Sequence, residues 1–152
     1  MKILLQEIWR SGINWDEQIE SKQWAKWQIW LRILPQVESV NVPKCYRTET
    51  DIGDRNVMQL HVFVDASENG FAAVAYLRFE DDGIDECALI DAKARVAPLR
   101  FVPIPRLELQ AAITGARFAN YIMESHKLQP SQRFFWTNSR DVLCWLNTDH
   151  RK

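Results

Sequence analysis

Three side chains with oxygen donors stand at positions where strands and helices can bring them to one site. Asp65 follows the apolar run 60–64, Glu108 lies near the start of a long amphipathic segment, and Asn138 follows a second apolar run. Carboxylates gathered without a thiolate or an imidazole suit hard divalent cations such as magnesium. Two such ions held about 4 Å apart activate a water and stabilise the leaving oxygen in phosphodiester hydrolysis. We therefore expect a catalytic metal site formed by Asp65, Glu108 and Asn138.

The pattern of apolar residues from residue 59 onward predicts the elements that position these side chains. Strands with short turns, at Asn69-Gly70 and at 81–83, indicate an antiparallel meander, and a long helix then crosses to a further strand. A helical crossover favours a parallel pairing of that strand with its neighbour. The prediction is an α/β fold with the order β-β-β-α-β-α: strands at 60–64, 71–79 and near 86–96, a helix from 106 to about 127, a strand at 133–137 and a helix around 142–146.

The first 58 residues have a different, helical character. Residues 2–10 predict a short helix, and a longer one capped by Asn14 or Asp16 is expected to end at Pro35. Tryptophans at 24, 27 and 30 form an apolar stripe on it, for which helix packing is favoured over base stacking. Residues 35–58 indicate a connector with one short strand near 40–42. We expect a helical segment at 1–58 and an α/β domain at 59–152.

Composition limits the classes of partner and compartment. The 152 residues carry a formal net charge of −1, so any grip on nucleic acid must come from a local patch. Three cysteines without CxxC spacing favour a reducing compartment. The short apolar run at the amino terminus and the lack of a long apolar stretch predict neither a signal peptide nor a membrane span. The expectation is an intracellular protein, cytoplasmic or nuclear, without a membrane partner.

Several polar residues outside the expected metal site are candidates for substrate binding. Lys93 and Arg95 share one strand face, and Arg106 lies at a helix start, which makes a phosphate-binding track plausible; solvation of a sheet edge explains them equally well. Ser67 and Asn69 are placed to contact a ribose hydroxyl, and they are equally well explained as turn formers.

Other chemistries have weaker support in the sequence. The three histidines lack metal-ligand spacing, and His61 is expected to be structural. Asp141 is expected to be a solvated charge on a helix rather than a ligand. The Asp51-Ile52-Gly53 triplet is interpreted as a connector turn because an aspartic protease has Ser or Thr in the middle position.

Four motifs in order carry a family resemblance. FVDAS, AKARVAPL, IPRLELQAA and WTNSRDVLCWL resemble the ribonuclease H-like region of Bel/Pao-type retrotransposon Pol polyproteins. Upstream, LLQEIWRSGINWDEQI, the tryptophan-rich segment and VPKCY are similar to the connecting region that follows reverse transcriptase in those polyproteins. The resemblance covers essentially the whole chain.

The resemblance implies a ribonuclease H-like fold that hydrolyses the RNA strand of RNA–DNA hybrids with Mg²⁺ or Mn²⁺, next to a reverse transcriptase region. Asp65 and Glu108 match two metal-binding carboxylates, and Asn138 stands where the family has a third aspartate. An amide oxygen lacks the negative charge that holds a divalent ion, so impaired catalysis is expected. The chain is also expected to be incomplete, since the family fold continues with a strand and a helix beyond residue 152. The alternative is a non-catalytic remnant with a nucleic-acid-binding or structural role.

Overall fold

The computed structural model describes residues 1–42, 46, 57–81 and 84–148. The chain divides into two compact units, one made of residues 1–44 and 98–100 and the other of residues 45–97 and 101–152. Asp51-Ile52-Gly53, Cys45 and His150 lie outside the described residues. No helix in the described ranges is both long and apolar enough to cross a membrane.

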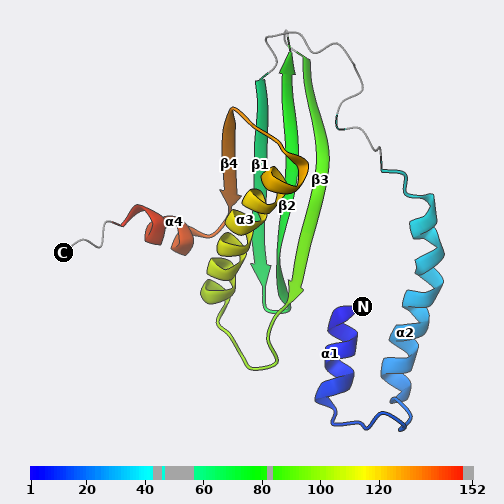
Figure 1. Cartoon of the computed structure of the whole chain (residues 1–152). Coiled ribbons are helices and arrows are strands. Elements are labelled where there is room, and N and C mark those ends of the chain that lie inside the picture. The colour runs from blue at the N-terminus through cyan, green and yellow to red at the C-terminus, as the bar shows by residue number, and fades with distance from the viewer. Residues whose placement is uncertain (43–45, 47–56, 82–83, 149–152) are drawn as a thin grey trace. The chain divides into compact units, whose positions relative to one another are not determined.

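The second unit is built on a four-stranded mixed sheet with the order β3-β2-β1-β4 (Figure 1). Its first three strands form the expected antiparallel meander, and β4 pairs with β1 in parallel. The α/β prediction, the order β-β-β-α-β-α and the parallel fourth strand are therefore confirmed. The elements are β1 (Val57–Ser67), β2 (Gly70–Asp81), β3 (Ile84–Val96), α3 (Ile104–His126), β4 (Gln132–Thr137) and α4 (Arg140–Asn147).

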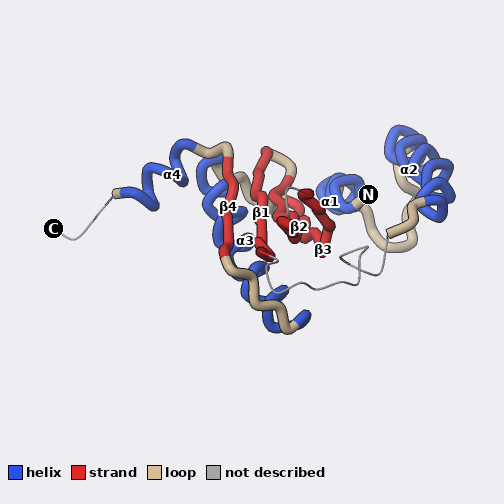
Figure 2. Tube along the Cα trace, turned by 90° about the horizontal axis from the view of Figure 1, so that it is seen from above, coloured by secondary structure: helices blue, strands red, loops and turns tan. Residues whose placement is uncertain are grey.

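Helix α3 packs on one face of the sheet and forms the core with it (Figure 2). Alternate residues of β1 and β2 point to this face, because side chains along a strand alternate between the two faces. Gly115 lets the helix approach closely, since a Cβ there would overlap the Cγ1 methyl group of Val64. The buried residues of this core are Leu60, Val62, Val64, Ala73, Ala75, Leu77, Ala111, Phe118, Ala119 and Ile122.

The first hairpin is longer than the sequence predicts. Strand β1 continues to Ser67, which pairs with Gly70, so the turn residues are Glu68 and Asn69 rather than Asn69 and Gly70. Gly70 is needed at this point because a Cβ would lie 2.6 Å from the carbonyl oxygen of Arg95 on β3. The close spacing of β2 and β3 thus depends on a residue without a side chain.

The first unit contains α1 (Lys2–Arg10), α2 (Ser21–Ile33) and the 3₁₀ helix η1 (Leu34–Ser39). The expected start of α2 at Asn14 or Asp16 is wrong. Glu17 instead accepts hydrogen bonds from the main-chain and side-chain nitrogens of Asn14, at 3.2 and 2.7 Å, which closes a local turn there. The expected strand near 40–42 is also absent from this described segment, which is exposed and has no pairing partner.

Candidate functional site

Two of the three predicted ligands line one pocket at the carboxyl ends of the parallel strands. The last paired residues of β1 and β4 are Val64 and Thr137, so Asp65 and Asn138 follow side by side. Both side chains are exposed, and the cavity that they line has a volume of about 360 Å³. Its lining residues are Phe63, Val64, Asp65, Ala72, Val74, Trp136, Thr137 and Asn138. Parallel pairing therefore brings together two residues that are 73 positions apart in the sequence.

Glu108 comes to the same end of the sheet from α3 and contacts the residue after Asn138. The hydroxyl of Ser139 donates a hydrogen bond of 2.6 Å to Glu108 Oε2. The amino-terminal end of α3 lies at the end of the sheet to which the arrowheads of β1 and β4 point (Figure 1). Glu108 is the fifth residue of α3 because the helix starts at Ile104, not at Arg106; it is therefore not in the first turn.

The three side chains approach this end of the sheet from different sides. Asp65 alternates with the buried Val64 and so belongs to the face opposite α3, whereas Glu108 is carried by the helix on the core face. Asp65 Oδ1 accepts a hydrogen bond of 2.8 Å from the amide of Ala66. Glu108 is not among the residues that line the Asp65–Asn138 pocket. The structure thus places Asp65 with Asn138 and links Glu108 to their neighbour Ser139.

Ser139 is the residue of this region that the sequence analysis missed. Its side chain is 4% exposed, caps α4 by accepting a hydrogen bond from the amide of Val142 at 3.2 Å, and donates to Glu108. A serine directly before a helix is a recognisable N-cap, so this role was accessible from the sequence. Asp141 is exposed in the first turn of α4, in keeping with a solvated charge.

A row of aromatic rings covers the sheet face that carries Asp65. The His61 ring stacks on Phe134 with centroids 4.8 Å apart, and Trp136 stacks on Phe63 at 5.8 Å. His61 Nδ1 accepts a hydrogen bond from Trp136 Nε1 at 3.1 Å, while Nε2 lies 3.1 Å from Gln59 Oε1. Partial burial, and to a lesser extent the Arg78 guanidinium, lower the pKa of His61. The neutral ring is therefore favoured, in a structural role.

The predicted substrate contacts fall into separate places. Lys93 and Arg95 line a second pocket, between β3 and α3, while Arg106 is exposed in the first turn of α3 and lines neither pocket. In the hairpin, Ser67 Oγ accepts a hydrogen bond from the amide of Asn69 at 3.3 Å and donates one to the carbonyl of Gly70 at 3.4 Å. Ser67 and Asn69 therefore take part in the turn, and their contact with a ribose hydroxyl stays a prediction.

The three predicted ligands, two at strand ends and Glu108 on α3, offer oxygen atoms only. In chemical type, the carboxylates of Asp65 and Glu108 and the amide oxygen of Asn138 are the ligands that Mg²⁺ and Mn²⁺ prefer, and two of these three residues, Asp65 and Asn138, share a pocket. Across the described part of the chain, no group of three or more His, Cys, Asp or Glu residues is arranged to hold a metal. Asn138 is not one of those residue types, and its amide is neutral, so only Asp65 and Glu108 among the three predicted ligands carry a charge.

Comparison with protein families gives one match for almost the whole chain. The family model for the Pao retrotransposon-like RNaseH-like domain matches residues 1–139. A comparison with curated proteins gave no match. The matched range includes all three predicted metal ligands as well as the helices of the first unit. The mixed sheet with its crossover helix and the match over residues 1–139 show that the chain belongs to the Pao retrotransposon-like RNase H-like domain family.

Proposed function

We propose that this domain hydrolyses the RNA strand of RNA–DNA hybrids at the carboxyl ends of β1 and β4, with an activity reduced by Asn138. The observation that carries the proposal is the shared pocket of Asp65 and Asn138, with Glu108 hydrogen-bonded to the adjacent Ser139. Membership of the RNase H-like family supports the substrate class. In the parent element, the domain would act next to a reverse transcriptase region.

In this proposal, Asp65, Glu108 and Asn138 hold Mg²⁺ or Mn²⁺. The bound ion would supply an activated water and charge stabilisation at the phosphate. Asp65 is the best placed ligand because its side chain is exposed at the pocket. Only its Oδ1 accepts the hydrogen bond from the Ala66 amide, so Oδ2 remains for an ion. The hydrogen bond from Ser139 fixes the orientation of the Glu108 carboxylate.

Asn138 accounts for the reduced activity in this proposal. It offers one neutral oxygen, so the site has two negative charges to set against the charge of the cation. Substitution by aspartate has nearly the same size and adds the missing charge. We therefore expect Asn138→Asp to cleave faster than the natural chain.

The test is a cleavage assay with an end-labelled RNA–DNA hybrid in the presence of Mn²⁺ or Mg²⁺. The samples are the natural chain, Asn138→Asp, Asn138→Asp with Asp65→Asn, and Asn138→Asp with Asp141→Asn as a matched control on α4. We expect Asn138→Asp to raise the rate at least about tenfold, in line with the usual effect of one acid–base or metal-binding group. Asp65→Asn should abolish that gain, and Asp141→Asn should not.

A hybrid that stays intact with Asn138→Asp, although the protein is folded and binds it, would contradict the hydrolytic proposal. That outcome would favour the alternative of a non-catalytic domain that binds nucleic acid. Cleavage that persists in the Asp65→Asn double variant would also contradict it, because a contaminating nuclease or another site would then be responsible.

A further inference from the structure

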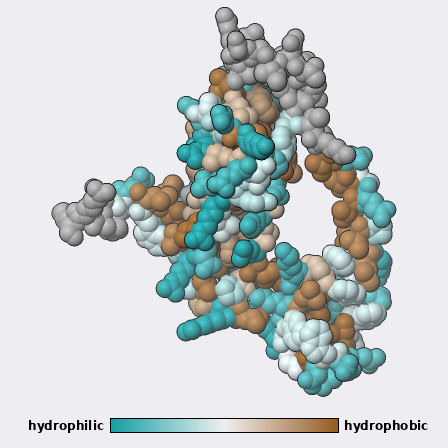
Figure 3. Space-filling model, in the orientation of Figure 1, coloured by the Kyte–Doolittle hydropathy of each residue, from teal (hydrophilic) through white to brown (hydrophobic). Residues whose placement is uncertain are grey.

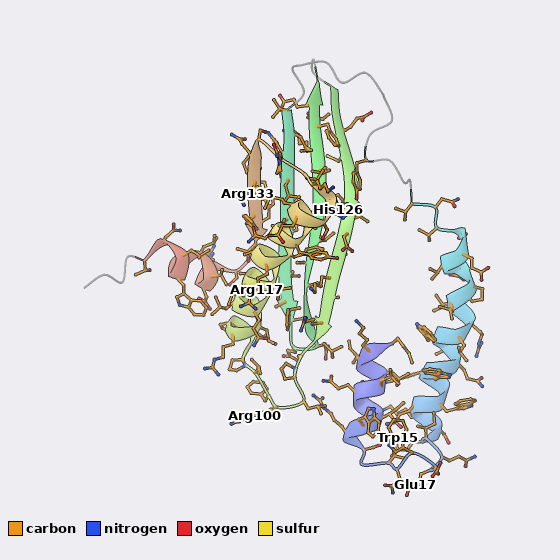
Figure 4. The ribbon with its side chains drawn as sticks, in the orientation of Figure 1. Trp15, Glu17, Arg100, Arg117, His126 and Arg133 are labelled. Atoms are coloured by element: carbon orange, nitrogen blue, oxygen red, sulfur yellow. The ribbon has the colours of Figure 1, made fainter. Side chains whose placement is uncertain are left out.

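A second pocket lies between α3 and the β2–β3 part of the sheet, and three cationic side chains line it. Lys93 and Arg95 come from β3. Arg117, labelled in Figure 4, comes from the middle of α3. The cavity has a volume of about 440 Å³ and also contains the polar side chains of Gln110 and Thr114. No carboxylate is among its lining residues.

The backbone explains why these side chains meet. Lys93 and Arg95 are two positions apart on a strand, so both point to the face that α3 covers. Gln110, Thr114 and Arg117 follow each other at intervals of four and three residues and form one stripe along α3. Hydrophilic side chains gather over the outward side of this helix (Figure 3).

The three cations have no partners within the described part of the chain. None of them makes a side-chain hydrogen bond or an ion pair there, whereas Arg78 in the same sheet is paired with Asp85 at 2.8 Å. Asp91 precedes Lys93 by two positions, but it does not line the pocket and its Oδ1 accepts the amide of Ala92 at 2.7 Å. Three unpaired cations in one concave site produce a local positive potential in a chain whose net charge is −1.

We propose that this groove binds backbone phosphates of a nucleic acid, with Lys93, Arg95 and Arg117 as the charged contacts. An arginine guanidinium donates hydrogen bonds to two phosphate oxygens at once, and a lysine adds a point charge. Gln110 and Thr114 provide neutral donors for the remaining oxygens. Arg117, which the sequence did not suggest, is the helix-borne contact that closes the groove opposite β3.

The inference rests on the proposed function in one respect, which is the choice of an RNA–DNA hybrid as the nucleic acid. The groove and the Asp65–Asn138 pocket share no lining residue. The groove would therefore position the duplex by its backbone without taking part in the cleavage step. Its contribution is to affinity and should be independent of metal.

The test is fluorescence anisotropy of a labelled hybrid with the full chain in EDTA, at salt concentrations from about 50 to 200 mM. The variants are Lys93→Gln, Arg117→Gln and the two combined, with Arg133→Gln as the matched control. Arg133 is an exposed arginine on β4, at the opposite edge of the sheet (Figure 4). Thermal unfolding of each variant identifies any loss that comes from misfolding.

We expect each groove variant to weaken binding and the double variant to weaken it further. Each lost phosphate contact should lower the slope of log K against log salt by about 1. Arg133→Gln should leave the slope near its natural value. Inorganic pyrophosphate is added as a small competing anion. It should displace the labelled hybrid only at concentrations far above the concentration of unlabelled hybrid that displaces it.

Three results would overturn the proposal. The first is that the natural chain does not bind the hybrid. The second is that the groove variants bind the hybrid as tightly as the natural chain does, or no more weakly than Arg133→Gln does. The third is that pyrophosphate binds the groove and the hybrid does not compete with it. The failure of the hydrolytic proposal has a different signature, which is a folded Asn138→Asp variant that binds the hybrid through the groove and leaves it uncut.

Discussion

Ser139 joins the candidate site to the folding of α4. The same side-chain oxygen donates to Glu108 Oε2 at 2.6 Å and accepts the Val142 amide at 3.2 Å, so one hydroxyl satisfies two groups. A buried hydroxyl that uses both its donor and its acceptor capacity cannot be replaced by a methyl group without leaving polar groups unpaired. The orientation of Glu108 and the start of α4 are therefore linked.

We predict that Ser139→Ala lowers the free energy of unfolding by about 0.5–2 kcal/mol, the usual cost of a lost N-cap. Urea denaturation of the natural chain and the variant measures this difference. Ser131→Ala serves as the control, because Ser131 also donates a hydroxyl hydrogen bond, to the carbonyl of Met58 at 2.8 Å, but is exposed and caps no helix. An effect of Ser139→Ala no larger than that of the control would contradict the capping role.

His61 makes the stability of the sheet depend on pH. Its Nδ1 accepts a hydrogen bond from Trp136, and this bond is lost if Nδ1 is protonated. Burial lowers the pKa of His61 in the folded state below its ordinary value of about 6.5. The unfolded chain therefore binds more protons in the interval between the two pKa values, and the stability falls as the pH falls through that interval.

We predict a lower urea midpoint at pH 5.5 than at pH 7.5 for the natural chain, with a smaller pH dependence in His61→Phe. Phenylalanine keeps an aromatic ring in the row between Phe134 and Trp136 but cannot take up a proton. The two urea titrations at each pH measure the difference. An equal pH dependence in both proteins would exclude His61 as its source.

The packing of α3 on β1 positions Glu108. Gly115 lies two turns after Glu108 and faces Val64, the residue before Asp65. A methyl group at this position would push the helix away from the strand or shift the valine. The distance between the two carboxylate-bearing elements therefore depends on a single glycine.

We predict that Gly115→Ala destabilises the protein by about 1–3 kcal/mol, despite the higher helix propensity of alanine, because the core there has no room. Ala116→Ser, an added atom on the exposed side of the same helix, should have a much smaller effect. Thermal unfolding of the two variants provides the comparison. A Gly115→Ala protein as stable as the natural one would mean that α3 is not closely packed on Val64.

The strands, α3 and the parallel strand pair were predictable from local sequence patterns. The side-chain contacts at the two pockets were not, because they join residues far apart in the sequence. Apolar spacing identified the strands and α3, and the helical crossover identified the parallel β1–β4 pair that brings Asp65 and Asn138 together. The hydrogen bond between Glu108 and Ser139 spans 31 residues and follows from where α4 begins. Likewise, Arg117 joins Lys93 only through the packing of α3 on the sheet.

The charged side chains of the protein gather in distinct places, although its net charge is close to zero. The net charge of −1 gives no general attraction to nucleic acid, yet the second unit has a groove whose three cations are unpaired among the described residues, and a separate pocket with one exposed carboxylate. This separation agrees with the two proposals above, in which the groove binds the backbone of the hybrid and the pocket holds the cation.

If Asp65 and Asn138 belong to one divalent-cation site, the affinity for Mn²⁺ depends on both side chains. A titration of Mn²⁺ into the natural chain, Asn138→Asp and Asp65→Asn measures this dependence. The dissociation constants are measured by calorimetry in the absence of nucleic acid. We predict that Asn138→Asp binds Mn²⁺ about 10–100-fold more tightly than the natural chain and that Asp65→Asn binds it more weakly. Equal affinities in the three proteins would contradict it.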